Sequence, residues 1–215
     1  MKIEFDWLCR LAILMLLSFP GVAQNTTIYS NFLPGNTFVC CGGEPVAGAP
    51  GSAFFGVAGP AQAAAPFTPT GNFRLTQIDL PLDFVASPTY TGGFNLSLNG
   101  DSGGVPGAAL ETWAGLVAPI QKGGTSSLVT TVFPAFTVPL LAGNQYWIVA
   151  SPAASTTCDL WLVTSDVGTG PGGRMAYDDG AGWVIQTVPT DGLAFDVSEY
   201  PPHSTSQTRC EFHRL

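Results

Sequence analysis

Short runs in which apolar and polar side chains alternate follow one another along most of the chain. The alternation is clearest at residues 94–98, where Phe94, Leu96 and Leu98 fall on one face and Asn95 and Ser97 on the other. Comparable runs occupy residues 27–33, 52–57, 72–84, 93–98, 108–113, 128–138, 145–150, 159–163, 183–188 and 193–197. Turn-forming Gly, Pro and Asn separate them. The pattern predicts an all-β fold, an antiparallel β-sandwich of jelly-roll type with one solvent-facing side to each sheet.

The first 23 residues have the pattern of a secretory signal peptide. An apolar run from Leu11 to Phe19 follows Arg10, and Gly21 and Ala23 stand at the −3 and −1 positions of a cleavage site. This run is too short to span a bilayer, which takes roughly 20 residues. We therefore expect three parts: a signal peptide at 1–23, a sandwich domain at 24–197 and a polar tail at 198–215, with no membrane span after cleavage.

Composition narrows the class of protein further. Only 10% of the residues are charged and 46% are apolar, which excludes a disordered chain and a coiled coil. With 7 Lys and Arg against 15 Asp and Glu, the net charge is −8. Nucleic acid is therefore excluded as a partner, because phosphate binding depends on clustered Lys and Arg.

Four cysteines remain once Cys9 is removed with the signal peptide. In an oxidising compartment an even number indicates disulfides. Because Cys40 and Cys41 are adjacent, a bond between them would be strained, and we expect one of them to pair with Cys158. The partner of Cys210 is left open.

Catalytic chemistry has few candidate residues in this sequence. Both histidines, His203 and His213, lie in the polar tail, so a Ser-His-Asp or Cys-His site would lack a rigidly held base. A hydrolase with two carboxylates is the remaining enzymatic alternative, with Glu44 and Glu111 among the acids available. We expect a protein that is not an enzyme.

Two kinds of binding site are compatible with the residues. Asp101, Asp178 and Asp179 stand in glycine-rich turns and are candidate ligands for calcium, although such aspartates also serve simply to close turns. Trp113 and Trp183 are candidates for stacking on a glycan, and the alternative for a Trp in a β-run is the core. No other cofactor is expected.

The turn at residues 101–107 is predicted in more detail. Gly103 and Gly104 permit positive φ, and Pro106 fixes φ at about −65°. The turn would therefore join the strand that contains Leu96 to the strand that contains Leu110.

Several motifs together resemble a known family. They are Ala65–Pro69 followed by Phe73–Leu82, Phe94–Leu98 followed by the turn Asp101–Gly107, and Leu141–Trp147 with the later Gly182-Trp183. Their order over residues 27–197 resembles the bacterial choice-of-anchor extracellular domains, most closely the R type. The resemblance implies an exported β-sandwich without established catalytic residues.

The resemblance and the signal peptide together suggest a role outside the cytoplasm. We expect a secreted protein, extracellular or periplasmic, that takes part in adhesion or in a matrix and has a surface protein or an extracellular glycan as its partner. The family is usually followed by a sorting tail, and no such motif follows Val197, so we expect release rather than anchoring. A carbohydrate-binding module, assisted by calcium, is the alternative function.

Overall fold

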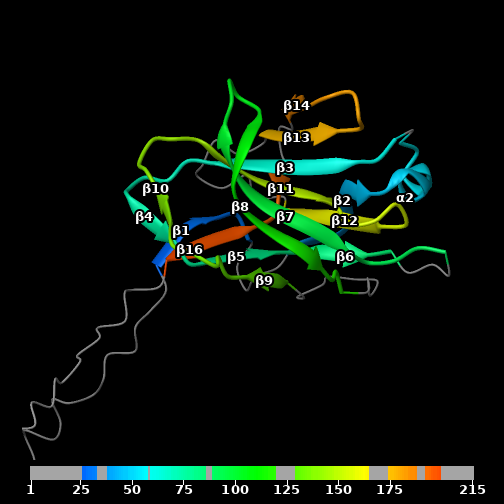
Figure 1. The fold of residues 1–215 in the computed structure, drawn as a ribbon, viewed down its shortest axis with the longest axis horizontal. Coiled ribbons are helices and arrows are strands. Elements are labelled where there is room, and N and C mark those ends of the chain that lie inside the picture. Colours follow the sequence, from blue (N-terminus) through cyan, green and yellow to red (C-terminus); the bar gives the residue numbers. More distant parts are fainter. Residues whose placement is uncertain are drawn as a thin grey trace, which may run out of the picture. The chain divides into compact units, whose positions relative to one another are not determined.

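The computed structural model describes residues 26–32, 38–57, 59–85, 89–119, 129–164, 174–187 and 192–199. Thr26–Glu199 form one structural unit, built almost entirely of antiparallel strands (Figure 1). The predicted signal peptide and most of the predicted tail lie outside the described residues. Within the described ranges no helix has the length and apolar character needed to cross a membrane.

One layer of the fold is a six-stranded antiparallel sheet. Its strands run in the order β14 (Val184–Thr187), β13 (Arg174–Asp178), β3 (Gln62–Phe67), β11 (Tyr146–Pro152), β7 (Phe94–Asp101) and β8 (Pro106–Leu116). β3 and β11 lie in the middle, and β8 and β14 are the two edges. As the sequence predicts, Gly103 and Gly104 have positive φ, at 69° and 90°, in the turn between β7 and β8.

Shorter sheets make up the opposite layer. One has the order β1 (Thr26–Ser30), β16 (Asp196–Glu199), β5 (Gln77–Leu80) and β9 (Thr130–Val132); the other has β15 (Gly192–Leu193), β12 (Cys158–Thr164) and β2 (Val39–Ala47), with β6 (Leu82–Phe84) also paired to β12. Pro81 alone separates β5 from β6, and its carbonyl accepts a hydrogen bond from the Leu162 N–H. A small β4–β10 pair (Phe73–Leu75 and Val138–Leu140) completes the fold.

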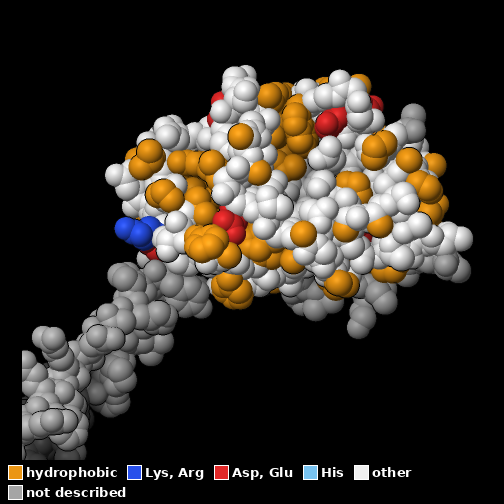
Figure 2. Space-filling model, in the orientation of Figure 1, with side chains coloured by type: hydrophobic (Ala, Val, Ile, Leu, Met, Phe, Trp, Pro, Cys, Tyr) orange, Lys and Arg blue, Asp and Glu red, His pale blue; other side chains and the backbone are white. Residues whose placement is uncertain are grey.

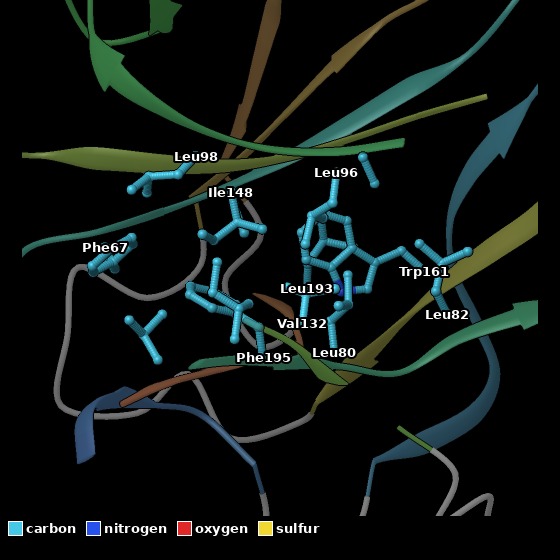
Figure 3. Close-up of a cluster of buried hydrophobic side chains, with 14 of the residues drawn as sticks. Phe67, Leu80, Leu82, Leu96, Leu98, Val132, Ile148, Trp161, Leu193 and Phe195 are labelled. Carbon is cyan, nitrogen blue, oxygen red and sulfur yellow. The ribbon is translucent and has the colours of Figure 1, made fainter. Parts of the chain in front are cut away.

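The main core lies between the two layers (Figure 3). Leu96, Leu98 and Ile148 reach it from the six-stranded sheet, and Leu80 and Phe195 reach it from the other side. The alternation in the sequence sets this packing, since β7 buries every second residue and leaves the intervening ones half-exposed. The all-β prediction is confirmed.

The prediction that each sheet has one solvent-facing side is wrong for the central strands. Trp147 and Val149 of β11 lie in a second apolar cluster with Ala64, on which Trp183 packs. Leu160 and Leu162 of β12 likewise lie in a third cluster, separate from the main core. These strands are buried on both faces because side chains of other segments, among them Trp183 and Phe55, pack on their outer faces, which strand periodicity does not reveal.

The segment predicted as a strand at residues 52–57 is instead the end of α2 (Ala49–Phe54) and the turn after it. Pro50 is the second residue of this helix, in the first turn, where its fixed φ is favourable. The Ser52 hydroxyl donates hydrogen bonds to the carbonyls of Ala47 and Gly48 at 3.1 Å. A Cβ on Gly51 would stand 2.0 Å from the Thr157 carbonyl oxygen, so close packing requires glycine there.

The C-terminal boundary of the domain lies two residues beyond the predicted one. Ser198 and Glu199 belong to β16, where they pair with Thr27 and Thr26 of β1. Ser198 is almost fully buried. The sandwich therefore includes Ser198 and Glu199, beyond the predicted boundary at Val197.

Candidate functional site

Asp101, the first predicted calcium ligand, closes a turn. Its Oδ1 accepts hydrogen bonds from Gln145 Nε2 and Trp147 Nε1, each at 2.8 Å, and its Oδ2 accepts one from the Gly104 N–H at 3.0 Å. The carboxylate thus fixes the β7–β8 turn against β11.

Asp178 and Asp179 act in the same way in the turn after β13. Asp178 Oδ1 accepts hydrogen bonds from the N–H groups of Gly180 and Gly182, at 2.8 and 2.9 Å, and Asp179 Oδ1 accepts one from Ala181 at 3.3 Å. Across the described ranges, no three His, Cys, Asp or Glu side chains gather as a metal-binding group. Turn closure accounts for the contacts of all three predicted aspartates.

Replacing Gly104 by valine is expected to destabilise the protein by about 1–3 kcal/mol, because its φ of 90° is strained for a β-branched residue. Thermal unfolding measures the effect. Gly100→Ala is the matched control, since Gly100 lies in the same hairpin and a Cβ there would meet nothing within 4 Å. Equal unfolding temperatures for the two variants would refute the assignment of strain.

The two tryptophans predicted to stack on a glycan do not share a face. Trp113, on β8, packs against the main core, and its indole N–H donates a hydrogen bond to the Phe133 carbonyl at 2.8 Å. Trp183 packs against the cluster on the other face of the six-stranded sheet. Both rings are half-buried. A common stacking platform requires rings on one face, so the structure does not bring this predicted site together.

The predicted disulfide to Cys158 is wrong. Cys158 is buried with a free thiol, whose pKa is raised by burial and by the neighbouring Asp159. It pairs in register with Ala47, whereas Cys40 and Cys41 lie toward the other end of β2, near the Val39–Val163 pair. At about 3.3 Å per residue the separation is roughly 15–20 Å, far beyond the span of a disulfide. Cys210, whose pairing the sequence leaves open, lies outside the described residues.

A strip of exposed apolar side chains follows the free edge of β8. Of the six large apolar side chains that the described residues expose, five lie at this edge and are 49–79% exposed: Leu110, Val117, Phe133, Phe136 and Leu141. Phe133 and Phe136 stand in the loop after β9, which contacts β8 through hydrogen bonds from Trp113 Nε1 to the Phe133 carbonyl and from the Ala135 N–H to Glu111 Oε1. We call these five side chains the β8 strip.

The β8 strip carries little charge. Neither β8 nor the segment from Phe133 to Leu141 contains Lys or Arg, and the carboxylate of Glu111 is held by the Ala135 N–H at 3.2 Å. Figure 2, with β8 at the front, shows hydrophobic side chains spread over this side and few acidic ones. Edge strands of monomeric proteins are usually protected from pairing by charges, prolines or bulges. β8 has its one proline at its first residue, and its register with β7 shifts at three points.

A shallow depression of about 580 Å³ continues the strip at the turn end of β8. Leu110 and Leu141 line it together with polar side chains of Asn144 and Gln145. The Tyr146 hydroxyl at its base accepts a hydrogen bond from the Leu141 N–H at 2.9 Å. Side chains from three separate segments therefore converge next to the β8 edge.

Two aspartates of the opposite layer are buried without full hydrogen bonding. Asp159 is fully buried; its Oδ2 accepts a hydrogen bond from the Gly93 N–H at 3.2 Å, while Oδ1 has no described partner. Burial raises the pKa of Asp159 to about 7. Neither oxygen of Asp83 has a described partner, and burial raises the pKa of this carboxyl as well.

A second acidic pair lies on the surface of the β16–β5 sheet. Asp196 stands directly opposite Asp79, and burial together with the negative charge of Asp79 raises the pKa of Asp196 to about 6 against the effect of a hydrogen bond from Ser30. Asp79 accepts hydrogen bonds from Gln77 Nε2 and Thr131 Oγ1. None of these four aspartates stands out in the sequence, because each lies in an ordinary strand pattern.

No protein-family model matches the chain, and no curated protein matches its sequence. The proposals below therefore rest on the geometry and on the motifs in the sequence.

Proposed function

We propose that this protein is an exported, non-enzymatic β-sandwich domain, wound as a jelly roll, that acts in adhesion or in an extracellular matrix by associating with a second copy of itself through the β8 strip. The resemblance to the choice-of-anchor domains and the signal-like N-terminus support a place outside the cytoplasm. The concentration of exposed apolar side chains at one sheet edge is the observation that carries the proposed mode of action.

The chemistry of the edge favours a second copy over a charged partner. The segments that carry the β8 strip contain no Lys or Arg, and the carboxylate of Glu111 already accepts a hydrogen bond from the Ala135 N–H. This edge therefore offers no complement to a strongly charged surface. Its five side chains expose roughly 500 Å² in total, within the range in which patches on monomers are often functional. Two copies would bury about twice that area, close to the lower limit for a specific interface.

Antiparallel pairing of β8 from two copies of the protein is compatible with two-fold symmetry. An antiparallel strand pair around a two-fold axis presents the same residues from both partners, as closed dimers do. An axis near Leu110, at the middle of β8, would bring the two β8 edges together and join two six-stranded sheets into one, with the pairing interrupted at the bulges of β8. Backbone groups at the free edge would then be hydrogen-bonded.

Leu110→Lys is expected to convert the dimer to a monomer, because the interface would then bury an unpaired charge. Light scattering after size-exclusion chromatography of the full chain measures the molar mass over a range of concentrations. Val184→Lys is the matched control, since Val184 is 43% exposed and lies on the other edge strand of the same sheet.

We expect the wild type and Val184→Lys to have twice the mass of the chain and Leu110→Lys to have the mass of one. A monomeric wild type at all concentrations, or a dimer that Leu110→Lys leaves intact, would overturn the proposal. Circular dichroism checks that all three proteins are folded alike.

The glycan-binding alternative at Trp113 and Trp183 has no geometric support, because the rings lie on opposite faces of one sheet. A paired-carboxylate hydrolase is no better supported. Glu44 lines a pocket beside β13 and β14, whereas Glu111 is bonded to the Ala135 N–H beyond β8 at the other edge of that sheet.

A further inference from the structure

A pocket of about 330 Å³ lies where β2 of one layer faces β13 and β14 of the other. Its polar lining consists of Glu44 on β2, Gln62 at the start of β3, Tyr177 on β13 and Gln186 on β14. Phe55 and Val57, which follow α2, form an apolar wall. In Figure 1, α2 and the ends of β2 and β13 lie at the same end of the domain.

The strand register explains why polar side chains line the pocket. Glu44 is two residues before Val46 and Tyr177 is two residues after Met175, and both Val46 and Met175 belong to the main core. Gln186 stands directly opposite Met175. All three polar side chains therefore point toward the space between the layers, where the periodicity alone would place apolar residues.

These polar groups have no partner in the described part of the chain. The Glu44 carboxylate, the Gln186 amide and the Tyr177 hydroxyl make no hydrogen bond there to another protein group. Burial raises the pKa of Glu44. Three inward-facing polar side chains around one cavity are therefore free to hydrogen-bond a ligand that enters it in place of water.

We propose that this pocket binds the hydroxyl groups of a single neutral saccharide residue. Carboxylate and amide oxygens accept hydrogen bonds, the amide nitrogens donate them, and each sugar hydroxyl can do both. The apolar C–H face of a sugar ring fits the wall formed by Phe55 and Val57. The carboxyl group of Glu44 disfavours an anionic ligand. The volume of the cavity is near the lower limit for ligand pockets, so it suits a single sugar ring.

The saccharide pocket is independent of the proposed self-association. It lies beside β14, and the β8 strip is at the opposite edge of the same six-stranded sheet. Five strand spacings of about 4.8 Å separate the edges by roughly 24 Å. Both sites can therefore be occupied at once, and failure of one proposal leaves the other standing.

Saturation-transfer NMR on the full chain tests the pocket with four probes: D-glucose, D-galactose, D-mannose and N-acetyl-D-glucosamine. We expect transfer to the ring protons of at least one sugar, with an affinity measured by titration. Gln186→Leu removes hydrogen bonds at nearly constant shape and is expected to weaken binding about tenfold.

Two further variants keep the test decisive. Glu44→Gln preserves the shape and the fold while removing the charge, and a several-fold loss of affinity is expected. Asn144→Ala, in the depression next to β8, is the control and leaves binding unchanged. The proposal is overturned if none of the four sugars receives saturation, or if both pocket variants bind as tightly as Asn144→Ala.

Discussion

Replacing Trp161 by alanine is expected to destabilise the protein by about 3–5 kcal/mol. Trp161 is fully buried in the main core, where its ring packs edge-on against Phe195 with centroids 6.4 Å apart. Its indole N–H donates a hydrogen bond to the Ala194 carbonyl at 2.8 Å. The substitution therefore creates a large cavity and also leaves a buried carbonyl without its donor.

Thermal unfolding followed by circular dichroism or calorimetry measures this effect, and a fall of about 10 °C in Tm is expected. Trp183→Ala is the control, because the same ring is removed from a half-buried position outside the main core. We expect Trp183→Ala to destabilise the protein by less than half as much as Trp161→Ala. If Trp183→Ala cost as much as Trp161→Ala, the assignment of the main core would be wrong.

The stability of the protein is expected to fall as the pH rises from about 4 to about 8. Burial raises the pKa of Asp159 to about 7 in the folded state, whereas an unfolded Asp titrates near 3.9. Between these values the folded chain holds a proton that the unfolded chain has released, so each increase in pH favours unfolding. The stabilisation is complete below about pH 4 and is lost as the pH passes 7.

Asp196, with its pKa raised to about 6, contributes in the same direction over a narrower range. The raised pKa of Asp159 alone corresponds to a fall in the free energy of unfolding on the order of 3 kcal/mol between about pH 4 and about pH 8. Denaturant unfolding at a series of pH values measures it.

Asp159→Asn is the diagnostic variant, because it keeps the shape and removes the ionisation. It is expected to flatten most of the pH dependence and to be more stable than the wild type at pH 8, by about 2 kcal/mol. Asn144→Ala, which removes no ionisable group, is expected to keep the wild-type slope. A wild-type slope in Asp159→Asn would show that this carboxyl does not titrate as its burial requires.

Some features follow from local sequence alone. The alternation in Phe94–Asp101 specified a half-buried strand, and Gly103 and Gly104 specified the positive φ of the turn that follows it. These features are local because side-chain direction in a strand and the φ of a glycine turn depend on neighbouring residues.

Other elements could not be predicted because their signals are tertiary. The alanine-rich β3 has no alternation, yet it is a central strand whose residues from Ala63 to Phe67 are all buried. The run at residues 52–57 has strand-forming residues, but Pro50 and the contact of Gly51 with Thr157 place a helix there. Strand propensity has little influence on the conformation of a segment whose residues are selected by close packing.

The candidate sites divide in the same way. Sequence identified Asp101, Asp178 and Asp179 as residues of turns, and they do close turns. It could not place Trp113 and Trp183 on opposite faces, nor bring Glu44 next to Gln186, because those relations depend on which strands become neighbours.

The sequence by itself determined the all-β class and the turn chemistry, since both arise from contacts between residues close together in the chain. The tertiary structure alone decided the strand order, the exposed β8 edge, the distance of Cys158 from Cys40 and Cys41, and the polar pocket between the layers. Each of these depends on pairing between segments far apart in sequence, and the free energy of that pairing comes from packing across the whole core.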